Sequence, residues 1–501
     1  MCEAEEGGCG GGQLTRPPRD GCLLKCMKCK EGSPVLIIRV GDAFCKACFK
    51  DYFVHKFRAM LGKNRCIYPG EKVLLAFSGG PASSSMVRQV EEGLSREAAK
   101  KLRFKPGIIF VDEGAVCGQG PDTREETRRQ VETILRATGF PYHLLSLEEV
   151  FDLPASILRS VSDTAATHGH SYKEAVDGFI QQQRKEAGDA ARKEPAATSN
   201  TGPPPVSRTE ELSRLFGAAK TLTAREELLQ TLRSHLILHV ARTNGYAKVM
   251  AGDSCTRVAV KLLTSLCLGR GAFLAADTGF SDNRYGGVLV LRPMREYAAK
   301  EIAFYNRLFG VPTVFTPALD TKAPDRASIH RLIESFLYKL QSEFPSTIST
   351  VYRTGEKLGV TPRDAAADGP TELEKCLFCL CALDTNIVGG SSLEATLLSE
   401  QLCQKRPQPS GSSGGCCGEA RKQTDCCRGP LGPGTAPHSG SLLPLLCYSC
   451  RTTLKDMSSW ESLPPYIHSE AEGRRCRSAM KAEIQEFLLE EDAGGEDPPL
   501  S

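Results

Sequence analysis

The chain has 501 residues and a formal net charge of +3, and hydrophobic residues make up 41% of it. This length and composition predict a globular protein of roughly two to four domains with a sizeable core, and exclude a fibrous or wholly unfolded chain. The net charge is too small to indicate nucleic-acid binding by itself.

The N-terminal residues lack the basic, apolar and small-residue order of a signal peptide, and no apolar run approaches about 18 residues. We therefore expect a cytosolic or nuclear protein with no membrane segment, and of these two locations we predict the cytoplasmic one. Thiols stay reduced in that compartment, so the C-x-x-C pairs among the 22 cysteines favour metal ligands over disulfides.

The first folded segment is expected at 21–66, after a disordered lead at 1–20. It contains two C-x-x-C pairs, formed by Cys26, Cys29, Cys45 and Cys48. Each pair can place two thiolates on a tetrahedral zinc ion. The apolar residues between the pairs can form a hairpin that holds the two turns apart. Cys22 and Cys66 lie close by in sequence and are spare cysteines.

Short apolar runs alternate with longer amphipathic segments from about Lys72 to Thr316, which predicts a parallel α/β sheet. The predicted strands are 72–77, 107–112, 142–147, 248–252 and 287–293. The predicted helices are 84–98, 122–139, 223–245, 255–269 and 295–310. We place this domain at 70–320, interrupted by a charged, Pro-rich insert at 184–211 that is expected to be disordered.

The first predicted strand and helix are joined by a loop that reads Ser78-Gly79-Gly80-Pro81-Ala82-Ser83. A strand that leads through two glycines into a helix brings backbone N–H groups and a helix N-terminus together, which suits an anion. The loop therefore predicts phosphate binding at Ser78, Gly79, Gly80 and Ser83. The alternative is an ordinary strand-to-helix turn made of small residues.

The C-terminal part is expected to contain a helical extension at 321–375, a zinc ribbon at 376–454 and a partly helical tail at 455–501. The C-x-x-C pairs of the ribbon are formed by Cys376, Cys379, Cys447 and Cys450. The low-complexity segment 404–441 between them is expected to be disordered. Closing such a long loop costs little extra entropy. Cys381 and the doublets 416–417 and 426–427 are rival ligands. Four thiolates leave no open position on zinc, so both sites are expected to be structural.

Four segments together resemble the PP-loop ATP pyrophosphatase superfamily. Residues 78–83 resemble its S-G-G-x-D-S loop, and 110–114 resemble its strand that ends in Asp-Glu-Gly. Residues 250–269 resemble the segment that reads G-H-N-x-D-D, and 291–310 the segment that carries R-P-L-x-E. With its flanking zinc modules, the chain is most similar to the cytosolic tRNA 2-thiolation protein 2 family. The resemblance implies an adenine nucleotide alpha hydrolase-like fold.

The sequence departs from the active members of this superfamily at the positions expected to hold magnesium. Ala82 stands in place of an aspartate, and Thr256 and Arg257 in place of an aspartate pair. The sulfur-handling cysteine pair of active thiouridylases is also absent, because no cysteine occurs between Cys117 and Cys255. We therefore predict no catalytic residue, weak phosphate binding, and use of ATP and magnesium only through a partner subunit.

The resemblance implies a subunit of the complex that forms 2-thiouridine at the wobble position of lysine, glutamine and glutamate tRNAs. Its implied partners are a catalytic thiouridylase subunit in a heterodimer, tRNA, and a ubiquitin-like thiocarboxylate carrier that supplies sulfur. Basic residues around the first zinc module could contact tRNA phosphates or be ordinary surface. Two other functions stay open: a self-sufficient ATP-dependent adenylating enzyme, and a zinc-ribbon adaptor without a role in tRNA modification.

Overall fold

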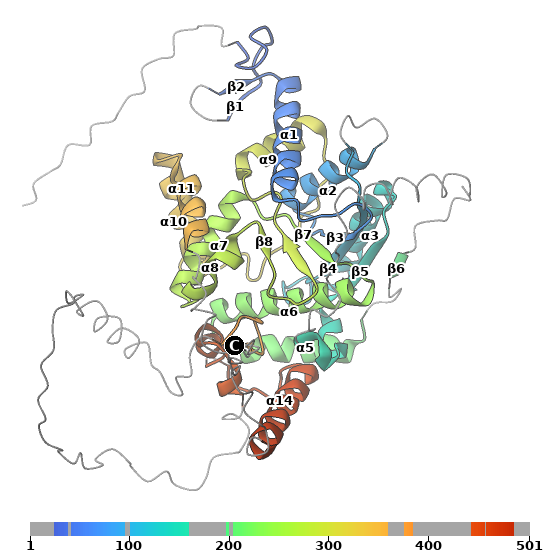
Figure 1. Cartoon of the computed structure of the whole chain (residues 1–501), viewed down its shortest axis with the longest axis vertical. Coiled ribbons are helices and arrows are strands. Elements are labelled where there is room, and N and C mark those ends of the chain that lie inside the picture. The colour runs from blue at the N-terminus through green and yellow to red at the C-terminus, as the bar shows by residue number, and fades with distance from the viewer. Residues whose placement is uncertain are drawn as a thin grey trace, which may run out of the picture.

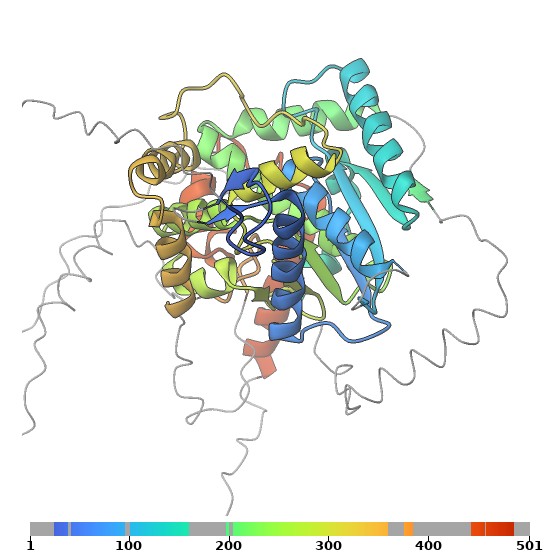
Figure 2. The same cartoon turned by 90° about the horizontal axis from the view of Figure 1, so that it is seen from above.

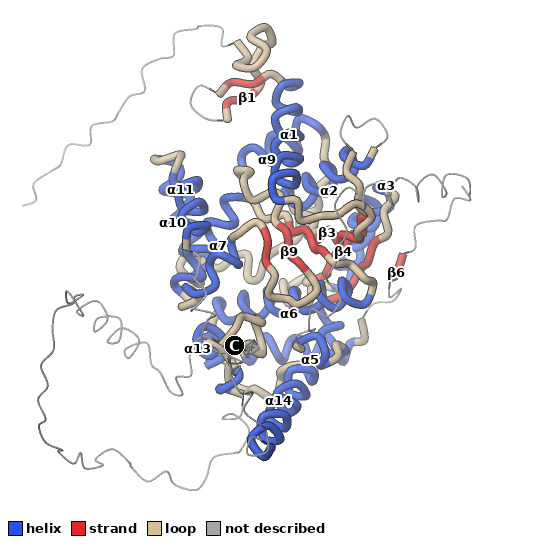
Figure 3. The backbone as a smooth tube through the Cα atoms, viewed as in Figure 1, coloured by secondary structure: helices blue, strands red, loops and turns tan. Residues whose placement is uncertain are grey.

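The computed structural model describes residues 25–38, 42–95, 101–159, 197–199, 204–358, 375–383, 442–455 and 457–484; Figure 3 distinguishes their helices and strands. The predicted disordered lead, the 404–441 insert and the end of the tail lie outside these residues. No helix within them is long and apolar enough to cross a membrane.

A seven-stranded sheet forms the centre of the molecule (Figure 1). Its order is β6 (Ala197–Ser199), β5 (Tyr142–Ser146), β4 (Lys105–Asp112), β3 (Lys72–Ala76), β7 (Lys248–Ala251), β9 (Leu289–Leu291) and β8 (Ser281–Asp282). All neighbouring strands pair in parallel except β8 and β9. The chain leaves β3 toward β4 and later returns to its other side with β7, and ligands bind at such a switch in open α/β sheets.

Helices cover both faces of the sheet, as Figures 1 and 2 show. They are α2 (Pro81–Leu94), α3 (Pro121–Thr138), α5 (Val206–Ala218), α6 (Leu222–Thr243), α7 (Cys255–Cys267), α8 (Leu274–Thr278) and α9 (Ala299–Phe309), with short 3-10 helices at Leu147–Asp152, Ala155–Leu158 and Gly271–Phe273. Val73 and Leu75 pack into the core beneath α2 and α9, whereas Leu74 packs on the opposite side with α5 and α6. This alternation follows from the two-residue period of a strand. The predicted α/β class is confirmed.

The N-terminal module consists of a hairpin and a long helix. β1 (Leu36–Ile37) and β2 (Ala43–Phe44) pair antiparallel, as predicted, and α1 (Lys46–Asn64) then runs along α9. The ring of Phe53, which is fully buried, stacks on Tyr305 of α9 with centroids 4.0 Å apart. These contacts fix the module onto the α/β domain.

The C-terminal elements pack at two places. α10 (Ile329–Glu343) and α11 (Thr347–Lys357) lie on α7, where Leu337, Ile348 and Val258 share one apolar cluster. The 3-10 helix Leu443–Leu445, α13 (Tyr448–Lys455) and α14 (Pro465–Ile484) lie on the α6 side of the sheet. α10 and α11 lie within 321–375, the segment predicted as a helical extension, of which 359–374 lie outside the described residues.

The structure differs from the prediction within 184–211. Residues Ala197–Ser199 pair with β5, and α5 begins at Val206. The first turns of α5 are polar, and its buried apolar residues, such as Leu212 and Leu215, lie just beyond the predicted boundary. The prediction of a disordered insert rested on composition alone, and it was wrong at 206–211, where an amphipathic helix begins.

Candidate functional site

The loop after β3 is held in shape by a second loop that follows α9. Gly79 has a φ of 78°, in the left-handed region that favours glycine. The Val314 N–H donates to the Gly79 carbonyl at 2.9 Å, and the Thr316 hydroxyl donates to the Ser78 carbonyl at 3.2 Å. A Cβ atom on Gly79 would lie 3.2 Å from the Val314 carbonyl oxygen. The turn therefore has both the conformation and the close packing that require glycine.

The side chain of Ser83 points back into this loop. Its hydroxyl accepts from the Ser78 N–H at 3.2 Å and donates to the Gly80 carbonyl at 3.0 Å. Gly252, after β7, packs against the same place, because a Cβ there would lie 2.9 Å from the Ser83 backbone nitrogen. The first turn of α2 begins with Pro81, and the N–H groups of Ala82 and Ser83 have no partner inside the helix, whereas the Ser84 N–H donates to the Gly80 carbonyl.

A cavity of about 1340 Å³ lies beside the loop at the carboxyl ends of the central strands. Its lining includes Ser78, Gly80, Ala82 and Ser83 from the loop, Asp112 at the end of β4 with Glu113 and Gly114 after it, Asp253, Ser254, Thr256 and Arg257 after β7, and Arg292 after β9. The four motifs that the sequence singled out thus meet at one cavity. Gly79 supports the loop from behind and does not line it.

The carboxylates of the Asp-Glu-Gly segment are already engaged by arginines. Glu113 forms two hydrogen bonds with the guanidinium of Arg233, one of them at 2.9 Å. Asp112 pairs at 2.8 Å with Arg124, which also binds Glu148. A metal ion could use these oxygens only after an ion pair had been broken.

The other positions that would hold magnesium offer no carboxylate set either. The side chain of Arg257 pairs with Glu334 at 3.4 Å, and Asp253 lies 3.5 Å from Arg292. Thr256 is 4% exposed, and its hydroxyl oxygen has no hydrogen-bond partner in the described part of the chain. Within those residues, the groups of His, Cys, Asp or Glu that could share an ion are two sets of four cysteines.

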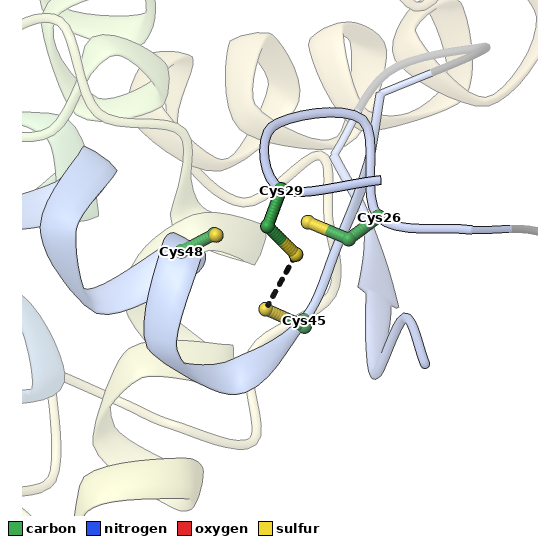
Figure 4. Close-up of side chains that lie close together, drawn as sticks. All are labelled: Cys26, Cys29, Cys45 and Cys48. Carbon is green, nitrogen blue, oxygen red and sulfur yellow. Dashed lines mark hydrogen bonds between the residues drawn. The ribbon is translucent and has the colours of Figure 1, made fainter. Parts of the chain in front are cut away.

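The first set joins Cys26, Cys29, Cys45 and Cys48 (Figure 4). All four sulfur atoms lie within 4.8 Å of one another, and those of Cys29 and Cys45 are 3.9 Å apart. Cys45 caps the N-terminus of α1 and Cys48 lies in its first turn. The partial positive charge of a helix N-terminus favours thiolates at this position.

Backbone N–H groups favour the thiolate form of two cysteines in this first set, and a thiolate is the form that binds a cation. Those of Cys29 and Cys45 lower the pKa of Cys26 to about 6, and the Gly32 N–H lowers the pKa of Cys29. Burial raises the pKa of Cys48 to about 12. A bound cation would displace the proton that this buried thiol keeps.

The second set joins Cys376, Cys379, Cys447 and Cys450, also within 4.8 Å. The sulfur atoms of Cys379 and Cys447 are 3.6 Å apart, and the Cys447 N–H donates to the Cys376 sulfur. The second pair lies at the start of α13, so the site differs from a ribbon of two β-turns. Of the rivals, Cys381 instead contacts Arg284 at 2.8 Å, and the two doublets lie outside the described residues.

Buried polar contacts that the sequence did not indicate support the second set. His235 on α6 lies 2.9 Å from the Phe378 carbonyl through Nε2 and 2.7 Å from the Tyr466 hydroxyl through Nδ1. Burial lowers the pKa of His235 to about 4, so the imidazole is neutral. Its Nε2–H can therefore donate to the carbonyl while Nδ1 accepts from the tyrosine. No local pattern marks such a residue, since the contacts join distant segments.

Known proteins resemble this chain over nearly its whole length. A family model described as cytoplasmic tRNA 2-thiolation protein 2 matches residues 328–452. Proteins with that name from Rattus norvegicus and Danio rerio are each 53% identical over 98% of this chain, covering 96% and 100% of their own lengths. The Homo sapiens protein is 52% identical over 95% of both chains.

A solved structure, the U34-tRNA thiolase NcsA from Methanococcus maripaludis with its 4Fe-4S cluster, aligns with a TM-score of 0.45 at 14% identity. The alignment covers 69% of this chain and 92% of that one. The identity with the curated relatives, together with their coverage, assigns the family. The chain belongs to the cytoplasmic tRNA 2-thiolation protein 2 family.

Proposed function

We propose that this chain is a non-catalytic subunit of the machinery that introduces 2-thiouridine into tRNA. The observation that carries this proposal is the identity of more than half of its residues to tRNA 2-thiolation proteins, over 98% of the chain. The family's name also agrees with the predicted cytoplasmic location. The finer proposal is that the modified base is the wobble uridine of lysine, glutamine and glutamate tRNAs.

The non-catalytic role follows from the charges around the cavity. Carboxylates that hold magnesium must offer free oxygens to the ion and its phosphates. Here Glu113 is occupied by Arg233, and Ala82 and Thr256 carry no charge. ATP activation and sulfur transfer are therefore assigned to a catalytic thiouridylase subunit that pairs with this chain, with sulfur supplied by a ubiquitin-like thiocarboxylate carrier.

Each cysteine set is proposed to hold one structural zinc ion. Tetrahedral zinc with Zn–S bonds of about 2.3 Å keeps its sulfur ligands about 3.8 Å apart. The observed 3.9 Å in the first set and 3.6 Å in the second support a single ion in each. Thiolates that surround a four-iron cluster would have to be more widely spaced. Zinc would tie α1 to the hairpin and α13 to the Cys376–Cys379 turn.

The loop at Ser78, Gly79, Gly80 and Ser83 is proposed to bind phosphate weakly. The helix N-terminus of α2 favours an anion, but the Ser83 hydroxyl already occupies the Ser78 N–H. The basic residues of the first module are proposed to contact tRNA. Those with exposed side chains include Lys25, Lys28, Lys30 and Lys46.

The test of the tRNA role is to delete the gene, reintroduce the full chain, and measure 2-thiouridine in bulk tRNA by mass spectrometry. The proposal expects thiolation to disappear on deletion and to return with the chain. Unchanged thiolation would favour the zinc-ribbon adaptor.

The partner proposal has a separate test. Affinity purification of the full chain from cells is expected to recover a protein whose own loop reads S-G-G-x-D-S. Recovery of the chain alone, from cells in which it restores thiolation, would contradict a stable heterodimer and favour a self-sufficient enzyme.

A further inference from the structure

We propose that residues 392–403, a leucine-rich segment outside the described residues, dock as a helix along an apolar stripe on the surface of α10. The stripe consists of Ile329, Leu332, Phe336 and Leu340. The docking joins two parts of the same chain and is independent of the proposed tRNA role.

α10 has apolar side chains on two sides. Leu337 is buried against α7 and α11. The stripe residues recur at i, i+3, i+7 and i+11, so they share another face of the helix. Leu332 and Phe336 are 47% and 50% exposed, and none of the four belongs to the apolar clusters of the described chain. Since α10 lies at the edge of the molecule in Figures 1 and 2, this face is open to a further element.

The segment 392–403 differs from the low-complexity insert that follows it. The insert 404–441 contains one leucine, whereas the segment contains two leucine pairs, each spaced by four residues: Leu393 with Leu397, and Leu398 with Leu402. Side chains at this spacing are neighbours on a helix. Ser391 and Glu394 have the spacing of a capping box, and Pro407 follows the last leucine. The sequence therefore predicts an apolar helix that needs a surface to cover it.

The segment is tethered near the start of α10. The described chain stops at Leu383, four residues after Cys379. The charge of Cys379 acts on Arg270, which pairs with Glu227. The same carboxylate lies 2.8 Å from Nε2 of His330, in the first turn of α10. Residues 384–392 can extend over about 30 Å, which is enough to cross this short series of contacts and reach the stripe.

Three observations favour this segment over another protein as the occupant. A short tether keeps the segment at an effective concentration on the order of millimolar beside the stripe. Lys339 is exposed next to the stripe, and the segment carries Glu394 and Glu400, which have the opposite charge. The family model that matches 328–452 begins at the N-cap of α10 and includes the segment, so both lie in one continuous unit of the family.

The first test is a photo-crosslink from the stripe. Phe336 is replaced by benzoylphenylalanine in the full-length chain, which is irradiated at dilute concentration and digested for mass spectrometry. We expect a crosslink to a peptide from 392–403, on a chain that still migrates as a monomer. Benzoylphenylalanine at Phe315, which is 80% exposed on the loop after α9, is the matched control and should not reach this peptide.

The second test is hydrogen exchange. Backbone amides of 393–402 should exchange about tenfold or more slowly than in a free peptide of the same sequence, because a docked helix protects them. Phe336→Glu should remove this protection, since a carboxylate would face the leucines, whereas Phe315→Glu should leave it unchanged. Melting curves and zinc content check that each variant folds, and the crosslink decides the matter if Phe336→Glu does not.

Two results would overturn the proposal. One is a crosslink from Phe336 to a second copy of the chain, or to a co-purified partner, without any crosslink to 392–403. The other is exchange of the 393–402 amides at the rate of the free peptide in the unmodified chain. Either result would leave the tRNA role intact, because the 2-thiouridine assay judges that role separately.

Discussion

Replacing Arg270 by methionine is expected to destabilise the part of the α/β domain that lies next to the second cysteine set. Arg270 pairs with Glu227, whose side chain is 4% exposed, and His330 Nε2 lies 2.8 Å from the same carboxylate. In Arg270→Met the buried carboxylate keeps only the imidazole. Removing one partner of a buried pair costs about 3–5 kcal/mol, which lowers the melting temperature of a domain of about 150–250 residues by about 6–20 °C.

Arg270→Met is also expected to change how firmly the second cysteine set holds its proposed zinc ion. Burial lowers the pKa of Arg270, but Glu227 and, to a smaller extent, the sulfurs of Cys450 and Cys379 raise it, so the guanidinium also lies close enough to favour negative charge on the second cysteine set. A chromogenic chelator should therefore extract zinc from the second set sooner than from the first. The double variant Arg270→Met with Glu227→Gln should recover much of the lost stability, because no buried charge is left unpaired. A single variant that melts like the unmodified chain and releases zinc at the same rate would refute this reasoning.

Three other changes have defined outcomes. Burial alone would raise the pKa of Glu227 and of Asp282, but arginines lower each to about 2. Since the unfolded-state values are about 4, this stabilisation is complete above about pH 5 and is lost as the pH falls toward 2. In urea unfolding, the difference in the free energy of unfolding between the unmodified chain and Glu227→Gln should therefore shrink below pH 4. A difference that stays constant with pH would contradict a lowered pKa of Glu227. Gly252→Ala should destabilise the protein by about 1–3 kcal/mol in thermal melts, because the added Cβ would meet the Ser83 backbone. The control Gly217→Ala should not destabilise it, because open space surrounds that position. Equal effects of the two substitutions would argue against close packing between Gly252 and Ser83. Cys29→Ser should lose one zinc by elemental analysis while Cys66→Ser keeps two; equal metal content would contradict the ligand assignment.

The parts predicted from sequence are those with a local signature. The strands around 72–77 and 107–112 have continuous apolar runs, and the C-x-x-C pairs bring two ligands together by their spacing alone. The structure confirms the parallel sheet and brings each predicted set of four cysteines within 4.8 Å. The hairpin between Cys29 and Cys45 also has a local cause, because a short apolar segment has to reverse direction there.

The parts that could not be predicted depend on tertiary placement. Glu113 follows β4 and Arg233 lies on α6, so no local sequence pattern indicates that they form an ion pair. The short strands β6 and β8 have too few residues for a periodic pattern, and composition placed the polar first turns of α5 in a linker.

The central claim is that this chain supports tRNA thiolation without activating ATP itself. Its most direct test is to incubate the purified full-length chain with ATP, magnesium and tRNA, and to measure AMP formation, alone and with the co-purified catalytic partner. We predict AMP formation only when the partner is present. AMP formation and thiolated tRNA from this chain alone would contradict the account, because they would require a metal-binding set that its cavity lacks among the described residues.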